Sequence, residues 1–400
     1  MKTTGTIKQI LVSNGNWWRF YNKHKASIRP SILTNILKLL SCKHVIRGHR
    51  EYRCSNPDCS HIKYVPHTCK SKACSSCGKK ATEVWILKQI EILPETSWQH
   101  ITFTMPNTLW DFFWKNRFLL NKIGKIAASI IQKIAKKRGV TTGIFIAIHT
   151  FGRNLQRNVH IHLSTTTGGI SEDKTKWKDV FYDQKTVMRM WRYEIIKLFR
   201  KYHKDIGLDI PAKLKKELNH TNTFNHLLDE LYKKIWIVHC SKPSTSHKKN
   251  VEYLGRYTKR PPIAESKLRH YDGNEVAFKY LDHTTKTYRT ISLTNEEFIR
   301  RFIQHIPDTG FRMIRYYGFL ANRTRGVLLP LVNALLGHNE ETNKKGVVTY
   351  AQLIKANFNY NPLTCILCGS DLILHAVDYG KSSISNLIKF HRQLSLLKKI

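Results

Sequence analysis

The sequence has few acidic residues. Only 28 Asp and Glu residues stand against 67 Lys and Arg, so the formal charge of the 400-residue chain is +39. This excess of positive charge indicates a polyanionic partner, and nucleic acid is the first candidate. Attraction to a membrane surface is the alternative, but the basic residues are spread along the whole chain and form no single amphipathic or juxtamembrane cluster. The charge therefore favours nucleic acid.

Long apolar runs and nucleotide-binding loops are also absent. No run approaches the roughly 20 residues needed to span a bilayer, and no apolar secretory segment follows residues 1–4, so we expect no membrane partner. Gly380-Lys381-Ser382 ends like a phosphate loop, but His375 stands where its first glycine is required. We predict no nucleotide site there. Internal repeats and low-complexity tracts are absent as well.

Cysteine is sparse outside one segment. Six of the nine cysteines fall within residues 42–77, and in a chain without a secretory segment this crowding indicates metal rather than disulfides. Cys54-x4-Cys59 and Cys74-x2-Cys77 are two short pairs, each able to direct two thiolates to one point. We expect the two pairs to complete one tetrahedral Zn²⁺ site.

Other residues with metal-binding side chains surround these pairs. Lysines and arginines are interleaved with them, so a zinc module of this composition is expected to bind DNA. Near the end of the chain, Cys365-x2-Cys368 is a lone pair of thiols, either half of a zinc site or two ordinary cysteines. The candidates for a second zinc in the first segment are Cys42, His49, His67 and Cys69.

Residues 158–163, Asn-Val-His-Ile-His-Leu, have the period of a half-buried strand, with His160 and His162 together on one face. Two such imidazoles can hold one divalent cation. A half-exposed strand that carries two histidines and binds no metal would have the same sequence pattern. Two imidazoles leave coordination positions vacant. His149, on the adjacent predicted strand, is our candidate for the third ligand, with Gln156 as the alternative. Mixed nitrogen and oxygen ligands suit Mn²⁺ or Mg²⁺.

The elements around these histidines predict an α+β fold. A strand over 100–105, a helix over 119–138, and strands over 143–149 and 158–163 are the pattern of an antiparallel sheet with a covering helix. Other expected elements are helices within 171–234, a short strand over 235–240, a hairpin over 275–293 and a helix over 295–305. The expected divisions are a basic helical arm (1–41), a zinc-binding DNA-recognition domain (42–95), a sheet domain with a helical insertion (96–325) and a C-terminal helical tail with the CxxC pair (326–400).

Residues 250–262 predict a short helix, because Asn250 can begin it and the proline pair ends it. Tyr253 and Tyr257 are one turn apart on it, so their hydroxyls share a face. A pair of core tyrosines would show the same spacing. Segment 310–318 is rich in aromatic and arginine residues, which suits stacking on unpaired bases or ordinary packing equally. The candidates for DNA contact are Arg256, Lys259, Arg260 and Arg315.

These parts together suggest phosphoryl transfer. A metal held by imidazoles can withdraw charge from a scissile phosphate and align it with an attacking oxygen. A tyrosine hydroxyl is a suitable nucleophile, because the 5′-phosphotyrosine product stays activated for the reverse transfer without ATP. Two tyrosines would allow one to hold a cleaved end while the other attacks a second junction.

A set of short motifs occurs in order over about residues 42–325. They are Cys69…Cys74-x2-Cys77, His100-Ile-Thr-Phe-Thr-Met-Pro106, Ile148-His-Thr-Phe-Gly152, His160-Ile-His162, Tyr253-Leu-Gly-Arg-Tyr257-Thr-Lys-Arg, Glu297-Phe-Ile-Arg-Arg301 and Gly310-Phe…Ile-Arg-Tyr-Tyr-Gly318. In this set the chain resembles the two-tyrosine HUH transposases of rolling-circle insertion sequences, the insertion sequence ninety-one family. It departs from the family pattern in the Asn158-Val159 that precede His160, in Ala73, where a histidine is frequent, and in the wide Cys54–Cys59 spacing.

The resemblance implies a sheet-based HUH nuclease domain behind an N-terminal zinc domain. It implies that His160 and His162 bind the catalytic metal and that Tyr253 and Tyr257 are the nucleophiles for nicking one strand and transferring it. The implied partners are single-stranded or hairpin ends of the element and target DNA. Without a phosphate loop, strand separation falls to a host helicase or to supercoiling, and the expected location is the bacterial cytoplasm, at the nucleoid.

Two other functions use many of the same parts. A plasmid rolling-circle replication initiator or relaxase would share the nuclease chemistry but act at an origin. A non-catalytic zinc-dependent DNA-binding regulator would tolerate the loss of both Tyr253 and Tyr257.

Overall fold

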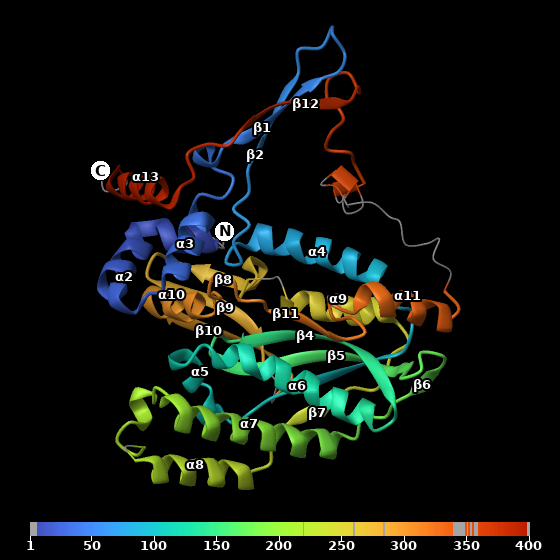
Figure 1. Ribbon diagram of the computed structural model, residues 1–400. Helices are drawn as coiled ribbons and strands as arrows, with labels where there is room; N and C mark the ends of the chain where they lie inside the picture. Colours follow the sequence, from blue (N-terminus) through green and yellow to red (C-terminus); the bar gives the residue numbers. More distant parts are fainter. Residues whose placement is uncertain are drawn as a thin grey trace.

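The structure is a computed structural model that describes residues 6–218, 220–258, 261–282, 285–338, 349, 351–352, 354–355 and 359–397. It confirms the α+β class, with helices on both faces of a central antiparallel sheet (Figure 1). The strand order is β11-β4-β5-β3-β7, and β6 pairs with β5 outside this path. The strands are β3 (Trp98–Phe103), β4 (Val140–Phe151), β5 (Arg157–Ser171), β6 (Trp177–Asp179), β7 (Val238–Cys240) and β11 (Ile314–Gly318).

One face of the sheet is mostly apolar and is covered by helices. Ile146 of β4, Ile161 of β5 and Phe103 of β3 lie in one buried cluster with residues of α6 and α7. This is the alternation that a strand with one core-facing side requires. The helices below this face are α6 (Leu119–Lys136), α7 (Gln184–Ile206) and α8 (Thr221–Lys233), with the short α5 (Phe112–Lys115) beside them (Figure 1).

The opposite face carries the histidines and is covered by α4 (Ser75–Ile92) and α9 (His247–Thr258) (Figure 1). Val251 of α9 is buried in one cluster with Phe145 of β4 and Trp85 of α4. The two helices approach closely at Gly255, where an added Cβ would lie 2.5 Å from Cγ1 of Ile86. The absence of a side chain at position 255 therefore lets α9 lie against α4. Helix α11 (Arg325–Leu335) contributes Val332 to the same cluster.

The N-terminal helices share a core with a later part of the chain. Trp17 and Ile36 are buried in one cluster with Phe278, Phe298 and Phe302. Residues 1–40 are helical where described, as expected, but they do not form a separate arm, because their apolar face packs on α10 and its neighbouring strands. The elements of this unit are α1 (Ile7–Val12), α2 (Asn16–His24), α3 (Pro30–Leu40), β8 (Leu268–Tyr271), β9 (Glu275–Leu281), β10 (Tyr288–Thr294) and α10 (Asn295–Gln304).

A three-stranded sheet projects from the body of the molecule (Figure 1). Its order is β12-β1-β2, so a strand near the C-terminus pairs with one near the N-terminus. The expectation of a helical C-terminal tail is therefore wrong in part: the tail supplies β12 (Leu372–Asp378) before helix α13 (Ile384–Leu397). The other two strands are β1 (His49–Cys54) and β2 (Ile62–Pro66).

The expected insertion over 171–234 is mostly helical, as α7 and α8 show, but it begins with strand. Its first residues extend β5 and turn back as β6, where Trp177 pairs with Ile170. Gly168 leaves room for the Trp177 side chain, because a Cβ at position 168 would lie 2.4 Å from Nε1 of Trp177. Among the described residues, no helix is long and apolar enough to cross a bilayer.

Gly318, at the end of β11, generates a prediction about stability. Its φ is +63°, and an added Cβ would lie 1.7 Å from the carbonyl oxygen of Thr142. Gly318→Ala should therefore lower the free energy of unfolding by roughly 2–4 kcal/mol. Gly310→Ala is the matched control, since Gly310 has φ +77° but no described atom would meet its Cβ within 4 Å. Urea titration of both variants checks this; equal losses would contradict the close approach at Gly318.

Candidate active site and metal centres

Three histidines meet on the sheet face that α9 covers. The antiparallel register of β4 and β5 places His149 directly opposite His160, and Ala147 opposite His162. The ring centroids lie 5.1 Å apart for His149–His160, 5.6 Å for His149–His162 and 4.9 Å for His160–His162. One nitrogen from each ring lies within 4.8 Å of the other two. This donor set fits a single divalent cation.

Hydrogen bonds fix two of these rings. The carbonyl oxygen of Asn158 accepts from Nδ1 of His160 at 2.9 Å, so Nε2 is the candidate ligand atom of that ring. Nδ1 of His162 lies 3.2 Å from Nε2 of His100, which comes from β3. The His100 and His162 rings are stacked, 5.3 Å apart at an angle of 24°. A second shell of this kind orients a metal-binding histidine.

Burial favours the neutral form of His162 and of His100. His162 is 4% exposed, and burial, followed by its histidine neighbours, holds its pKa well below the usual value. Burial lowers the pKa of His100 to about 4, with a smaller contribution from His239. A neutral imidazole is the form that binds a metal, so burial favours the metal-binding form of His162.

His100 is a site residue that we did not assign from the sequence. The signal was its position, since His100 and Thr102 alternate with the core-facing Ile101 and therefore lie on the histidine face. The side chain of Gln156, the alternative third ligand, is exposed in the β4–β5 turn and accepts a hydrogen bond from Asn154 at 3.0 Å.

Helix α9, which carries Tyr253 and Tyr257, packs on β4 and β3, the strands of His149 and His100. The backbone of these two positions is helical, so they are one turn apart, and both lie nearly opposite Gly255 on the helix. The described residues do not include the side chains of these tyrosines or of Arg256. Lys259 and Arg260 lie outside the described residues altogether.

Strand β11 shows how the aromatic segment is used. The hydroxyl of Tyr316 donates to Oε1 of Gln89 at 2.8 Å and accepts from Nε1 of Trp85 at 3.2 Å, so this tyrosine packs on α4. The guanidinium of Arg315 donates to the backbone and side-chain oxygens of Asn121, at 2.8 and 2.5 Å. It also lies 5.7 Å from the ring centroid of Phe311. For segment 310–318 the sequence left base stacking and ordinary packing as alternatives, and the contacts of Tyr316 are those of ordinary packing.

Eight of the nine cysteines form two groups of four, and their grouping corrects the one expected from sequence. Spacing joined Cys54 and Cys59 to Cys74 and Cys77. In the structure the first pair lies in the projecting sheet and the second at the start of α4, so they cannot share one ion. One group is Cys42, Cys69, Cys74 and Cys77; the other is Cys54, Cys59, Cys365 and Cys368.

The first group has the dimensions of a zinc site. Sγ of Cys77 lies 3.7 Å from that of Cys42 and 3.5 Å from that of Cys69, and Cys74 lies 3.7 Å from Cys42. Four thiolates about 2.3 Å from Zn²⁺ stand about 3.8 Å apart in a tetrahedron. The backbone N–H of Ser71 donates to Cys69 at 3.4 Å.

His49 and His67 do not join this group, which corrects their candidacy for a second zinc. His49 begins β1, where its ring faces Asp378 at 3.7 Å and packs edge-on against Tyr64. Nε2 of His67 donates to the carbonyl oxygen of Asp378 at 3.0 Å. Both rings therefore make structural contacts where the N-terminal segment meets β12.

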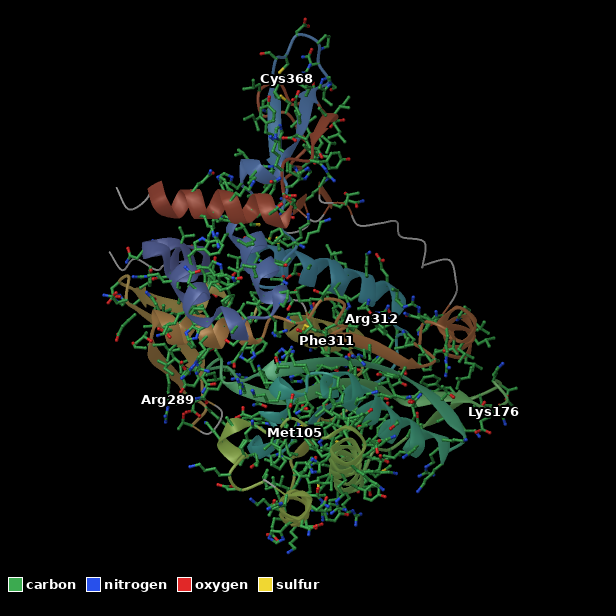
Figure 2. The ribbon with its side chains drawn as sticks, turned by 60° about the vertical axis from the view of Figure 1, so that its left-hand side comes forward. Met105, Lys176, Arg289, Phe311, Arg312 and Cys368 are labelled. Carbon is green, nitrogen blue, oxygen red and sulfur yellow. The ribbon has the colours of Figure 1, made fainter. Side chains whose placement is uncertain are left out.

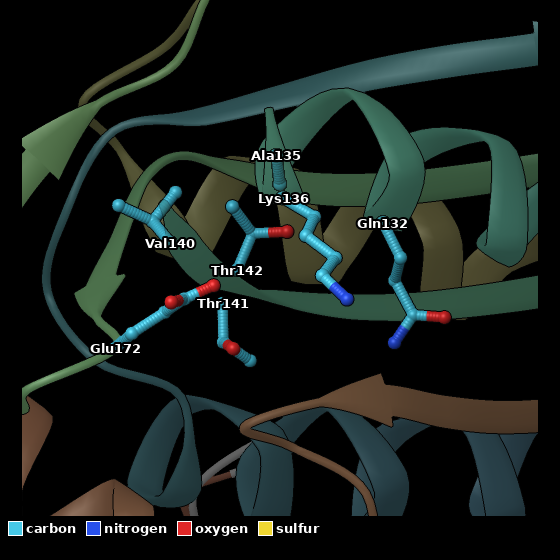
Figure 3. A pocket seen from close by; sticks show the side chains of 7 residues that line it. All are labelled: Gln132, Ala135, Lys136, Val140, Thr141, Thr142 and Glu172. Carbon is cyan, nitrogen blue, oxygen red and sulfur yellow. The ribbon is translucent and has the colours of Figure 1, made fainter. Parts of the chain in front are cut away.

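A hollow of about 230 Å³ lies at the start of β4, at the opposite end of the strand from His149 (Figure 3). The side chains that line it include Gln132, Lys136, Thr141 and Glu172. We assign no ligand to it.

Comparisons with known proteins identify the family of the chain. Residues 143–326, which contain the three histidines and α9, match the family described as "Putative transposase", and residues 14–105 match the "Transposase zinc-binding domain" of IS91. The transposase for insertion sequence element IS801 of Pseudomonas savastanoi pv. phaseolicola is 37% identical over 380 residues, 94% of this chain and 91% of that protein. The chain belongs to the IS91 family of transposases.

A second relative of this transposase, described as "Putative transposase y4qJ", comes from Sinorhizobium fredii (strain NBRC 101917 / NGR234). It is 30% identical over 288 residues, 70% of this chain and 72% of that protein. No solved structure matches the chain. Family membership makes the chain a DNA-processing enzyme. A DNA substrate agrees with the nucleic-acid partner that the charge of +39 predicts. The zinc-binding match also supports Zn²⁺ as the metal of the cysteine-rich segment.

Cys74 and Cys77 generate a prediction about that Zn²⁺. Replacing both by serine should remove one equivalent of zinc per chain and lower the thermal midpoint, because this group packs into the core of α1–α3. Cys240→Ser is the matched control, since Cys240 lies in β7 outside both groups. Zinc analysis by mass spectrometry checks this. Unchanged zinc in the double variant would rule out this site.

Proposed function

We propose that this transposase is an HUH single-strand DNA endonuclease and strand transferase that works through 5′-phosphotyrosine intermediates. One observation carries the proposal: His149, His160 and His162 converge on the sheet face against which α9, the helix of Tyr253 and Tyr257, is packed. A phosphate held at that face would have a metal-binding group on one side and a helix with two phenols on the other. The rolling-circle mode of transposition is part of the same proposal.

We propose Mg²⁺ or Mn²⁺ as the catalytic ion, held by His149, His160 and His162. Such an ion would draw charge from the non-bridging oxygens of the scissile phosphate. The protein's own part is to keep His162 neutral by burial, and to orient His160 and His162 through the hydrogen bond of His160 to the carbonyl oxygen of Asn158 and the contact of His162 with His100.

The proposed nucleophiles are the hydroxyls of Tyr253 and Tyr257. In the cleavage step one phenol oxygen bonds to phosphorus, the phosphorus–O3′ bond breaks, and the 3′-oxygen leaves with the proton as a 3′-hydroxyl. The strand stays joined to the tyrosine through its 5′-phosphate. Reversal by another 3′-hydroxyl transfers it, and two positions one helical turn apart allow two ends to be handled together.

The proposed substrate is single-stranded or hairpin DNA at the element's ends, with target DNA as the acceptor. Arg256, Lys259, Arg260 and Arg315 are proposed as its phosphate contacts, together with the basic cysteine-rich module. Strand separation would come from a host helicase or from supercoiling. The site of action would be the cytoplasm, at the nucleoid.

Two alternatives remain distinguishable by experiment. A replication initiator or relaxase would nick at a replication or transfer origin rather than at an element terminus. A non-catalytic DNA-binding regulator would bind DNA and form no covalent adduct.

The tyrosine proposal predicts a covalent protein–DNA adduct. Incubation with single-stranded oligonucleotides from the element's ends and Mn²⁺ should yield a band that survives denaturing electrophoresis, and peptide mapping should place it on Tyr253 or Tyr257. Tyr253→Phe with Tyr257→Phe should abolish the adduct but keep DNA binding in a gel shift, because only the hydroxyls are lost. Tyr193→Phe, an exposed position on α7, is the control. An adduct that persists in the double variant would refute the assignment.

The metal proposal predicts a role for His100 as a positioning residue. His162→Ala should abolish Mn²⁺ binding at this site, and His100→Ala should weaken it about 10- to 100-fold, because the hydrogen bond that orients His162 is lost. His270→Ala, at an exposed position on β8, should bind as the parent does. The free Mn²⁺ signal in electron paramagnetic resonance reports the affinity. Parental affinity in His100→Ala would show that His100 only packs.

A further inference from the structure

The second cysteine group joins the two ends of the chain. Sγ of Cys54 lies 3.3 Å from Sγ of Cys368, and Sγ of Cys59 lies 3.7 Å from Sγ of Cys365. All four sulfur atoms lie within 4.8 Å of one another, and all four cysteines are free thiols. These separations are far longer than the roughly 2.05 Å of a disulfide and close to the edges of a zinc–thiolate tetrahedron.

The loop from Cys365 to Cys368 has the local geometry of a metal-binding turn. The backbone N–H of Leu367 donates to Sγ of Cys365 at 3.4 Å, a bond that favours a thiolate. Gly369, with φ +79°, closes the turn through its N–H to the carbonyl oxygen of Cys365 at 3.0 Å. From the other side, Nδ1 of His61 lies 3.1 Å from Sγ of Cys365. Such a contact is the usual second-shell support of a ligand.

Backbone pairing of β1 with β12 holds the two cysteine-bearing segments together. Strand β12 runs antiparallel to β1, from Cys54 opposite Leu372 to His49 opposite Asp378. The segments then cross at Gly48, where a Cβ would lie 2.1 Å from the carbonyl oxygen of Asp378. The segment Gly380-Lys381-Ser382 lies at this crossing. The backbone N–H of Lys381 donates there to the carbonyl oxygen of Ile46 at 2.9 Å.

Helix α13 completes the attachment. It packs on α3, with Leu387 fully buried and His391 6% exposed. The guanidinium of Arg392 lies 5.3 Å from the ring centroid of Trp18. The described part of the chain from residue 359 onward thus folds with the N-terminal unit, although neither family match, 14–105 or 143–326, includes it.

We propose that Cys54, Cys59, Cys365 and Cys368 bind a structural Zn²⁺ of their own, separate from the zinc of Cys42, Cys69, Cys74 and Cys77. Four thiolates in a tetrahedral set select zinc over Mg²⁺ or Mn²⁺. Binding releases the thiol protons to solvent and changes no oxidation state. The ion fastens the C-terminal loop to the tip of the projecting sheet, where Cys368 lies (Figure 2). The DNA-recognition module is then built from both ends of the chain.

Zinc stoichiometry of full-length variants tests the shared site. All are made in a His160→Ala, His162→Ala background, so that zinc at the histidines does not contribute. Cys365→Ser with Cys368→Ser should remove one equivalent of zinc, and so should Cys54→Ser with Cys59→Ser. All four together should still remove one equivalent and leave the zinc of the first group, which reports that the N-terminal unit is folded. Cys240→Ser should remove none.

Retention of all zinc after loss of Cys365 and Cys368 would overturn the proposal, as would a loss of two equivalents in the quadruple variant with an intact helical signal.

Alkylation of the unmodified protein gives a result that does not depend on variant folding. Cys368 is exposed, yet in the zinc-loaded protein it should resist iodoacetamide and become reactive together with Cys54, Cys59 and Cys365 as zinc is chelated. Immediate reaction of Cys368 in the zinc-loaded protein would also overturn it. So would a count of five rather than nine free thiols after denaturation, because that count would mean two disulfides. None of these measurements involves the tyrosine adduct, so the two proposals can fail separately.

Discussion

The antiparallel register of β4 and β5 is the constraint on which the candidate active site depends. It sets His149 opposite His160, and the two-residue period of β5 then adds His162 on the same face. A slip of β5 by one residue would turn His160 and His162 into the α6 core and bring Ile161 to the face that α9 covers. The buried isoleucines of the opposite face, Ile144, Ile146, Ile148 and Ile161, are all less than 2% exposed and therefore fix the register that brings the three histidines together.

The local parts of this arrangement could be predicted from the sequence. The alternation of apolar and polar residues identified the strands around residues 143–149 and 158–163. The 3.6-residue period of apolar residues identified α6. Both signals are clear because each element has one strongly apolar face. His149 could be anticipated because hairpin partners are close in sequence. His100 could not, since its approach to His162 needs β3 to pair with β5 over some 60 residues, and the sequence contains no local signal for that register.

The cysteines show the same limit more sharply. Spacing identified both short pairs near the N-terminus, but zinc ligands are chosen by proximity in the fold and not by proximity in the chain. Cys54 and Cys59 find their partners more than 300 residues away because β12 pairs with β1. Cys74 and Cys77 instead meet Cys42 and Cys69 at the start of α4. The same pairing gives the chain's C-terminal residues a role in a module that spacing assigned to residues 42–95.

The central claim is that a metal at the three histidines and a phenol of α9 reach the same phosphate. Anomalous diffraction from crystals of the transposase with Mn²⁺ and a single-stranded oligonucleotide from the element's end tests it most directly. The account predicts one manganese peak within bonding distance of His149, His160 and His162, a DNA phosphate oxygen on that ion, and the hydroxyl of Tyr253 or Tyr257 in line with the phosphorus. A peak elsewhere, or both phenols turned into packed interior, would contradict it.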